Sequence, residues 1–393
     1  MSFKKNIDRW YFSVFTGLLY AVAMPPFNSQ LHPALSFFPL LSFFVCIPLF
    51  LLSINASKKR AILHTYIFGI CASLGQLYWI AFVTPEGLWP LIIFSVLLLV
   101  LYEGIFFTVN GILFRWTYKK FPGMYTIIVP AWWVLIEYSK SLGEVSFPWT
   151  SIGYSLTPIL PVSQISSITG IYGMSFIIVL GNALIWKFLN VNGNSKEKKR
   201  SAALLSVFAA FLIAFSLWGW LRLHEHRVPA GPESKIALVQ PDIDQNKWGS
   251  RSLDTSFDVI DSMLQKAALD TPGVIILPES ALLCYLVKQP QLKKRVEGWS
   301  SKLKIPMILG SLDWQKAPAS SLEEYSVYNA AFFLDSGSDR FQPYYKVKLV
   351  PFSEALPFQG VFPILSRVNL GQADFKRGTK PVTFNICGKI SGA

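Results

Sequence analysis

The fold of this chain is decided in residues 202–240, which read AALLSVFAAFLIAFSLWGWLRLHEHRVPAGPESKIALVQ. The apolar run at 202–221 has the roughly 20 residues that a helix needs to span a bilayer. Pro229 and Pro232 follow in a linker, and residues 235–240 then have the pattern of a buried strand. The chain is therefore predicted to consist of a membrane domain at 1–222, a linker at 223–234 and a water-soluble domain at 235–393.

Apolar stretches of similar length occupy most of the chain before this point. Of 393 residues, 52% are apolar and only 15% are charged, which is too apolar for one soluble domain. The sequence predicts seven membrane-spanning helices, at 10–24, 33–54, 61–83, 88–114, 123–139, 162–186 and 202–221. The first stretch also resembles a signal peptide, but the six that follow it favour an uncleaved helix.

Basic residues alternate between the connections of these helices, and Lys and Arg near helix ends favour the cytoplasmic side. They gather at the N-terminus and in the second, fourth and sixth connections: Lys4, Lys5, Arg9; Lys58, Lys59, Arg60; Arg115, Lys119, Lys120; and Lys196, Lys198, Lys199, Arg200. The first and third connections have none, and the fifth has only Lys140. The soluble domain is therefore predicted to lie outside the cytoplasm.

Charge and cysteine content argue against two classes of protein. The net charge of +13 arises largely from cations in short loops between membrane helices, so nucleic acid is not expected as a partner. The four cysteines form no CxxC motif, so neither a metal nor another cofactor is expected. A disulfide between Cys284 and Cys387 is left open by the sequence alone.

The segment after the linker alternates strands with helices, which indicates an α/β domain. Strands are predicted at 235–240, 273–277, 305–309, 328–334 and 382–386, and helices at 254–268 and 292–303. All four histidines of the chain precede this domain. A histidine base within the domain is therefore excluded, and any general base must be a carboxylate, a lysine or a tyrosine.

Residues at strand ends are candidates for such a site, because α/β folds build sites at the carboxyl edge of the sheet. Glu279 directly follows the strand at 273–277, and its alternative role is helix capping or simple solvent exposure. Lys346 and Glu354 fall in the segment 344–354, whose alternative interpretation is an edge strand guarded by lysines. A lysine held by a carboxylate would instead stabilise an oxyanion.

One carboxylate lies inside a predicted membrane helix. Glu103 is near the middle of the stretch 88–114, with Asn110 two turns further along. A charge within the bilayer is costly and indicates a function by default. A buried, hydrogen-bonded role and a lateral surface for lipid entry both fit the sequence.

Short motifs occur in a specific order in both parts of the chain. They are the segment 132–137, Phe147-Pro148-Trp149, Gly153-Tyr154, Val239-Gln240, Lys247-Trp248, Pro278-Glu279, Tyr328-Asn329 and the segment 345–354. In this order and spacing they resemble the apolipoprotein N-acyltransferases, bacterial inner-membrane enzymes whose extracytoplasmic domain belongs to the nitrilase superfamily. The resemblance covers nearly the whole chain. It implies a polytopic α-helical membrane domain followed by an αββα sandwich.

The resemblance also implies roles for four residues. Glu279 would be the general base that takes a proton from a cysteine thiol, and Lys346 would stabilise the tetrahedral oxyanion. Glu354 would orient the lysine and the nucleophile. Trp248 would lie near the substrate entrance, with a buried structural role as its alternative.

The nucleophile departs from the family pattern, in which a cysteine in an Ile-Cys-Tyr-Glu motif follows a glycine-containing hairpin. Residues 388–393 resemble this hairpin and the start of the strand, so the cysteine is expected just beyond Ala393 and the domain is expected to be incomplete, or truncated, at its C-terminus. Cys387 lies on the wrong side of the hairpin to replace it, because moving it would shift the strand register. Cys387 is interpreted as structural and Cys284 as a core thiol.

For a complete protein the resemblance implies acyl transfer in two steps. A cysteine thiolate takes an acyl chain from a phospholipid, and the α-amine of a diacylglyceryl-cysteine on an apolipoprotein then attacks the thioester. The implied partners are therefore membrane lipids and apolipoproteins, with no cofactor. The alternatives are a membrane-bound amidase acting on a small amide, and a non-catalytic remnant that lacks the nucleophile.

Overall fold

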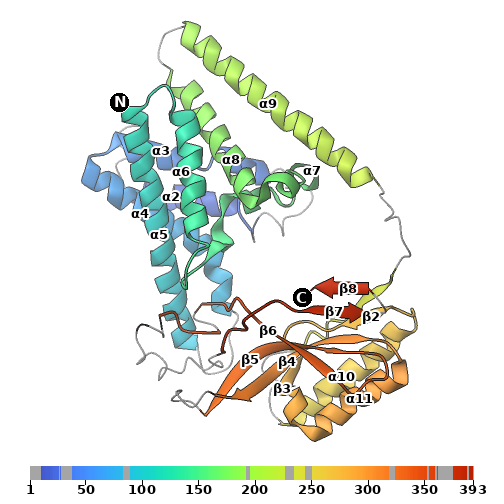
Figure 1. Cartoon of the computed structure of the whole chain (residues 1–393). Coiled ribbons are helices and arrows are strands. Elements are labelled where there is room, and N and C mark those ends of the chain that lie inside the picture. Colours follow the sequence, from blue (N-terminus) through green and yellow to red (C-terminus); the bar gives the residue numbers. More distant parts are fainter. Residues whose placement is uncertain are drawn as a thin grey trace. The chain divides into compact units, whose positions relative to one another are not determined.

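The computed structural model describes residues 10–25, 27, 38–82, 89–191, 195–225, 234–243, 250–317, 324–351, 354–358, 361, 375–386 and 389–392 (Figure 1). The chain forms two compact units, Met1–Arg227 and Val228–Ala393. The division falls inside the segment 223–234 that the sequence predicts as a linker. Each unit has its own apolar core, so each is described by itself.

The first unit is helical, and each of the seven apolar stretches holds a helix. The helices are α2 (Trp10–Val22), α3 (Ile47–Asn55), α4 (Lys58–Leu77), α5 (Trp89–Lys120), α6 (Tyr125–Ser139), α7 (Leu160–Ser163), α8 (Ser166–Asn190) and α9 (Ser195–His224). Short 3₁₀ turns extend or connect them at Phe38–Phe43, Tyr78–Phe82, Pro148–Thr150 and Ile152–Leu156.

Five of these helical segments are long and apolar enough to cross a membrane: Phe38–Asn55, Lys58–Phe82, Trp89–Lys120, Ser166–Asn190 and Lys196–His224. The first unit is therefore a multi-pass membrane unit. The helices α2 and α6 have 13 and 15 residues, which is shorter than a span requires, so seven spans remain a prediction.

Polar side chains inside the membrane unit have partners from distant segments. The amide of Asn182 on α8 donates to the carbonyl of Ser42 at 2.8 Å and accepts from the N–H of Cys46 at 2.9 Å, which ties the start of α3 to α8. Glu103 on α5 is fully buried and lies 2.5 Å from Nζ of Lys140, which follows α6. The hydroxyl of Thr150 bonds to both. Of the two roles that the sequence allows for Glu103, the buried hydrogen-bonded one fits.

The second unit is built on a mixed sheet in the order β1 (Ile236–Leu238), β2 (Val274–Ile276), β4 (Met307–Lys316), β5 (Tyr325–Leu334), β6 (Phe341–Tyr345). The first three strands of this order are parallel, β5 and β6 follow antiparallel, and β3 (Leu282–Tyr285) also pairs with β4. The sequence analysis missed β3 and β6 and ended β4 too early. Pro343 is tolerated in β6 because that strand lies at the sheet edge.

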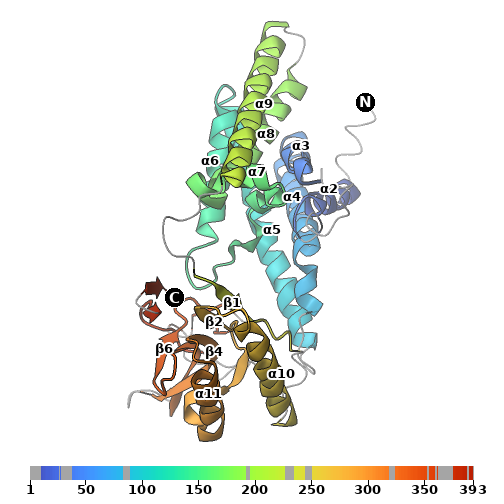
Figure 2. The ribbon, with the colours of Figure 1, turned by 90° about the vertical axis from the view of Figure 1, so that its right-hand side faces the viewer.

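Two helices and a hairpin cover this sheet. The helices α10 (Ser250–Ala268) and α11 (Pro290–Leu303) lie side by side against it and share its core, where the rings of Phe257 and Trp299 stack (Figures 1 and 2). The strands β7 (Thr383–Ile386) and β8 (Lys389–Gly392) pair antiparallel, as expected from the hairpin pattern. Phe384 of β7 stacks on Phe333 of β5, whereas the neighbouring Phe332 belongs to the helix-side core.

Candidate active site

Lys346 is positioned by the antiparallel pair β5 and β6. The backbone N–H of Lys346 donates to the carbonyl of Asn329 at 2.9 Å, which continues the ladder one residue past the end of β6. The carbonyl of Lys346 accepts from the N–H of Gly378 at 2.9 Å. A Cβ on Gly378 would lie 2.1 Å from the Tyr345 carbonyl oxygen, so only glycine permits this approach. The lysine backbone is therefore held from two sides.

Glu279 lies in the turn between β2 and β3, at the carboxyl end of a parallel strand as the sequence predicts. Ser280 has a left-handed φ of 53°, which turns the chain sharply after the glutamate. This turn crosses close over β4, because a Cβ on Gly310 would lie 2.1 Å from the carbonyl oxygen of Pro278. A glycine at this point of β4 is therefore needed to place Glu279.

The two carboxylates meet at Lys346. Its Nζ lies 2.9 Å from Oε1 of Glu279 and 2.9 Å from Oε1 of Glu354. The amide of Asn329 on β5 donates to the same two oxygens, with 2.9 Å to Glu354 and a short contact to Glu279. An amide nitrogen has two protons, one for each carboxylate. The structure thus brings together the three residues that the sequence predicts, and adds Asn329.

The carboxylates of Glu354 and Glu279 differ in their burial and in their hydrogen-bond partners. Glu354 is nearly buried, and its Oε2 accepts from the N–H of Val350 at 2.7 Å within a turn that its own N–H closes by donating to the Val350 carbonyl. Glu279 has a side chain that is 57% exposed. The bonds from Lys346 and Asn329 both go to its Oε1. Glu279 therefore has an oxygen available for proton transfer, whereas Glu354 is suited to holding the lysine.

The pKa values of Glu279 and Lys346 are shifted more by hydrogen bonding than by desolvation. Partial burial raises the pKa of Glu279. The hydrogen bonds from Lys346 and Asn329 lower it by a larger amount, so the net pKa lies below its ordinary value. Partial burial lowers the pKa of Lys346, and the bonds to Glu279 and Glu354 more than reverse this and leave its pKa raised. Both groups are therefore charged at neutral pH.

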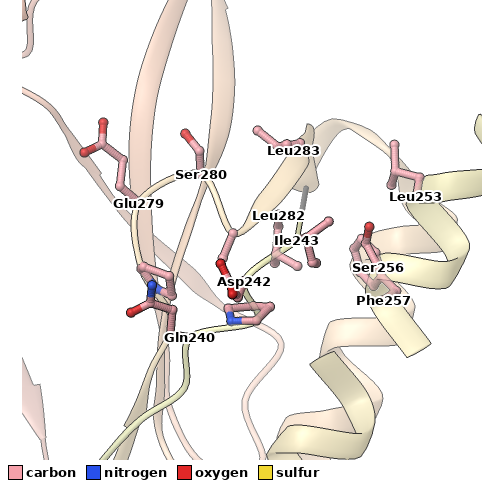
Figure 3. A pocket seen from close by; sticks show the side chains of 13 residues that line it. Gln240, Asp242, Ile243, Leu253, Ser256, Phe257, Glu279, Ser280, Leu282 and Leu283 are labelled. Atoms are coloured by element: carbon pink, nitrogen blue, oxygen red, sulfur yellow. The ribbon is translucent and has the colours of Figure 1, made fainter. Parts of the chain in front are cut away.

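A cavity of about 370 Å³ adjoins Glu279. It is lined by residues 240–243, by residues 278–283 and by Leu253, Ser256 and Phe257 of α10. Figure 3 shows the carboxylate of Glu279 directed away from Ser256 and Phe257. Glu279 therefore lies at the margin of the cavity, where its charge faces outward from the apolar helix side.

Tyr345, the last residue of β6, is anchored to β4 by its hydroxyl group. The hydroxyl of Tyr345 donates to Oδ2 of Asp313 at 2.7 Å and accepts from the amide of Gln315 at 2.9 Å. Burial, followed by the interaction with Asp313, raises the pKa of Tyr345 to about 12. The phenol therefore remains protonated at neutral pH and acts as an anchor rather than a base.

Asn329 is the residue of this cluster to which the sequence analysis gave no role. Its signal was its place in the Tyr328-Asn329 motif. Trp248 and Cys387 lie outside the described residues, so the roles predicted for them stay predictions. Cys284 is buried and free, and burial raises its pKa to about 11, which disfavours the thiolate and fits the interpretation as a core thiol.

Comparisons with known proteins place this architecture in a family. Residues 16–184 match the model of the apolipoprotein N-acyltransferase N-terminal domain. An apolipoprotein N-acyltransferase of Geobacter metallireducens is 30% identical over 94% of this chain and 68% of its own length, and one of Aquifex aeolicus is 28% identical over 90% and 74%. An amidase of the nitrilase superfamily from Nesterenkonia has 16% identity over 42% of this chain and 56% of its own, at a TM-score of 0.28.

The fold and the comparisons together define a multi-pass membrane protein with an attached α/β domain. The chain belongs to the apolipoprotein N-acyltransferase family. It spans 68% of the length of the Geobacter relative.

Proposed function

We propose that this protein transfers an acyl chain from a phospholipid to the N-terminal amine of a diacylglyceryl-cysteine lipoprotein. The observation that carries the proposal is the meeting of Glu279, Lys346 and Glu354 in a domain without histidine. A carboxylate and an ammonium so arranged supply a base and an oxyanion partner. Membership of the family supplies the substrate class, and the membrane unit gives access to lipid.

The proposed mechanism uses a cysteine nucleophile, which is expected just beyond Ala393 because residues 388–393 resemble the family's hairpin. Glu279 takes the thiol proton, and the thiolate attacks the ester carbonyl of the phospholipid. The ammonium of Lys346 stabilises the oxyanion, which collapses to a thioester as the lysophospholipid leaves with the proton from Glu279. The lipoprotein amine then attacks the thioester, gives a proton to Glu279 and forms the amide, while the thiol is restored.

Glu354 and Asn329 are positioning residues in this scheme. Glu354 lies 2.9 Å from Nζ of Lys346, and the amide of Asn329 donates to Oε1 of both carboxylates, so the two residues keep Nζ of Lys346 and Oε1 of Glu279 in place while charge moves. The family resemblance supports a location in the bacterial inner membrane, and the distribution of cations supports the periplasmic or extracytoplasmic side for the α/β unit. Trp248 is the fifth residue after Ile243, which ends the segment 240–243 that lines the cavity, and this closeness in sequence supports a role at the substrate entrance.

The test uses the protein encoded by the complete gene, in a bacterium depleted of its own lipoprotein N-acyltransferase. Mass spectrometry of a reporter lipoprotein should show an amide-linked third acyl chain with the wild type and none with Glu279→Gln. A reporter that stays diacylated with folded wild-type protein would overturn the proposal. Release of ammonia from small amides without acyl transfer would instead support the amidase alternative.

The nucleophile has a separate test. The codons after Ala393 are expected to encode an Ile-Cys-Tyr-Glu-like motif. Incubation with phospholipid should leave that cysteine acylated in a form that hydroxylamine cleaves, as a thioester requires. Acylation at Cys387 instead would reverse its interpretation as structural.

A further inference from the structure

A second cavity lies inside the membrane unit, between α3, α4 and α5. It has a volume of about 440 Å³, which is within the usual range for a bound small molecule. Its wall is largely apolar and includes Ala61 and Ile62 of α4 and Ile112 and Trp116 of α5. A Cβ on Gly111 would lie 2.8 Å from Oγ of Ser53, so α5 approaches α3 closely here. Ser53 and Gly111 both line the cavity at this close approach.

Four cations surround this apolar cavity: Lys58, Arg115, Lys119 and Lys120. Arg115 already bonds to the carbonyls of Ser53 and Ala56, at 2.8 Å each, and so closes the end of α3. The three lysines are exposed, and Nζ of Lys120 lies 5.6 Å from the ring of Trp116. Among the residues that the structure describes, no carboxylate lines this cavity. The positive charge at its margin is therefore not neutralised there.

An apolar cavity with a cationic margin fits a ligand with an anionic head and an apolar tail. Ile62, Ile112 and Trp116 are 38%, 42% and 44% exposed on helices of a membrane unit, where acyl chains can reach them. The general preference of cations for one side of the membrane explains why basic residues occur at these helix ends. It does not explain their convergence on a single apolar cavity.

We propose that this cavity binds an anionic phospholipid. The phosphate would lie among Lys58, Lys119 and Lys120, and an acyl chain would follow Ile112 and Trp116. Basic pockets between membrane helices bind anionic head groups in this way. None of these residues belongs to the cluster around Lys346, so this binding is separate from the proposed acyl transfer.

The test measures binding to the full chain in detergent micelles. Phosphatidylglycerol with brominated acyl chains should quench the fluorescence of Trp116, isolated as the difference between wild type and Trp116→Phe. Each lysine of the three replaced by glutamine should weaken binding about fivefold at low salt. The triple variant K58Q/K119Q/K120Q should therefore bind roughly a hundredfold more weakly, whereas K58R/K119R/K120R should bind like the wild type.

The matched control is K198Q/K199Q/R200Q, which removes the same charge from exposed positions at the start of α9, away from this cavity. It should leave quenching unchanged. An equal loss in the control, or equal quenching by brominated phosphatidylcholine, would overturn the proposal. Displacement of the lipid by millimolar inorganic phosphate would also overturn it, because the ligand would then be a free anion. Should the triple glutamine variant not fold, the three single variants decide.

Discussion

Among the lysines that pair with carboxylates in the described part of the chain, Lys140 and Lys346 have opposite surroundings. Lys140 is 5% exposed and its partner Glu103 is completely buried, whereas Lys346 is 24% exposed and its partner Glu279 is 57% exposed. Separating a buried pair would leave an unsolvated charge, so its geometry is fixed. A partly exposed pair keeps charges within reach of a substrate. The same ion-pair chemistry is thus suited to holding a loop in one unit and to a reaction in the other.

The largest effect is expected at the partly exposed Lys346 and its partner Glu279. Lys346→Met and Glu279→Gln should each lower acyl transfer by about 10²–10⁴-fold, because they remove the oxyanion partner and the base. The rate is measured as amide-linked acylation of a lipoprotein peptide by the protein of the complete gene. The matched control is Lys348→Met, an exposed lysine of the same segment, which should keep the wild-type rate. Activity that survives in K346M would mean that this cluster is not catalytic.

Substitution of the buried Lys140 should instead change the stability of the protein. Lys140→Met leaves Glu103 without its cation and should lower the free energy of unfolding by about 3–5 kcal/mol. The double variant E103L/K140M should recover much of this loss, because neither charge is then buried alone. Unfolding is followed in detergent by circular dichroism. For comparison, Arg222→Gln breaks an exposed pair with Glu225 and should cost about 0–1 kcal/mol.

The positions of the helices could be predicted from the sequence, but the buried pair of Glu103 and Lys140 could not. Seven apolar stretches correctly located helices, since long apolar runs are the strongest local signal. Lys140 was counted only as the single cation of the fifth connection, and Glu103 as a charge within a helix. Their pairing depends on how α5 packs against the segment after α6, which no local pattern encodes.

The cluster around Lys346 shows the same limit on a smaller scale. Glu279 was identifiable from its place after an apolar strand, but Lys346 and Glu354 were tied to it only by family resemblance. Asn329 received no role because an asparagine within a strand has no distinctive pattern. Its role follows from register, since Asn329 lies opposite Leu312 on β4 and accepts from the Lys346 N–H. Register is a property of the assembled sheet.

The pH dependence of stability should follow from the pKa shifts of Glu279 and Lys346. The lowered pKa of Glu279 means that its contribution to stability is present above the ordinary value of 4.5 and is lost as pH falls through the lowered pKa. The raised pKa of Lys346 means that its contribution is present below the ordinary value of 10.5 and is lost as pH rises through the raised pKa. The pair should therefore be intact across the whole neutral range.

Asn329→Ala tests this electrostatic account. It removes a hydrogen bond that lowers the pKa of Glu279, so the acidic limb of kcat/KM should move to higher pH. The rate at neutral pH should fall by about tenfold, the value of one hydrogen bond to a charged group. The control Asn385→Ala changes an exposed asparagine of β7 and should leave the profile in place. An unmoved acidic limb in N329A would show that Glu279 does not control it.

The smallest effect is expected at Tyr345, which precedes Lys346 but contacts Asp313 instead. Tyr345→Phe should lower the free energy of unfolding by about 1.5 kcal/mol, because its hydroxyl then no longer bonds to the buried carboxylate of Asp313 or to the exposed amide of Gln315. Activity should change only slightly, since the backbone of Lys346 is still held by Asn329 and Gly378. With a pKa raised to about 12, the phenol of Tyr345 does not titrate near neutrality, so the ratio of wild-type to Y345F rates should stay constant between about pH 6 and pH 9. A ratio that changes with pH would place Tyr345 among the reacting groups, and the distinction between anchoring and reacting residues would then fail within the α/β unit itself.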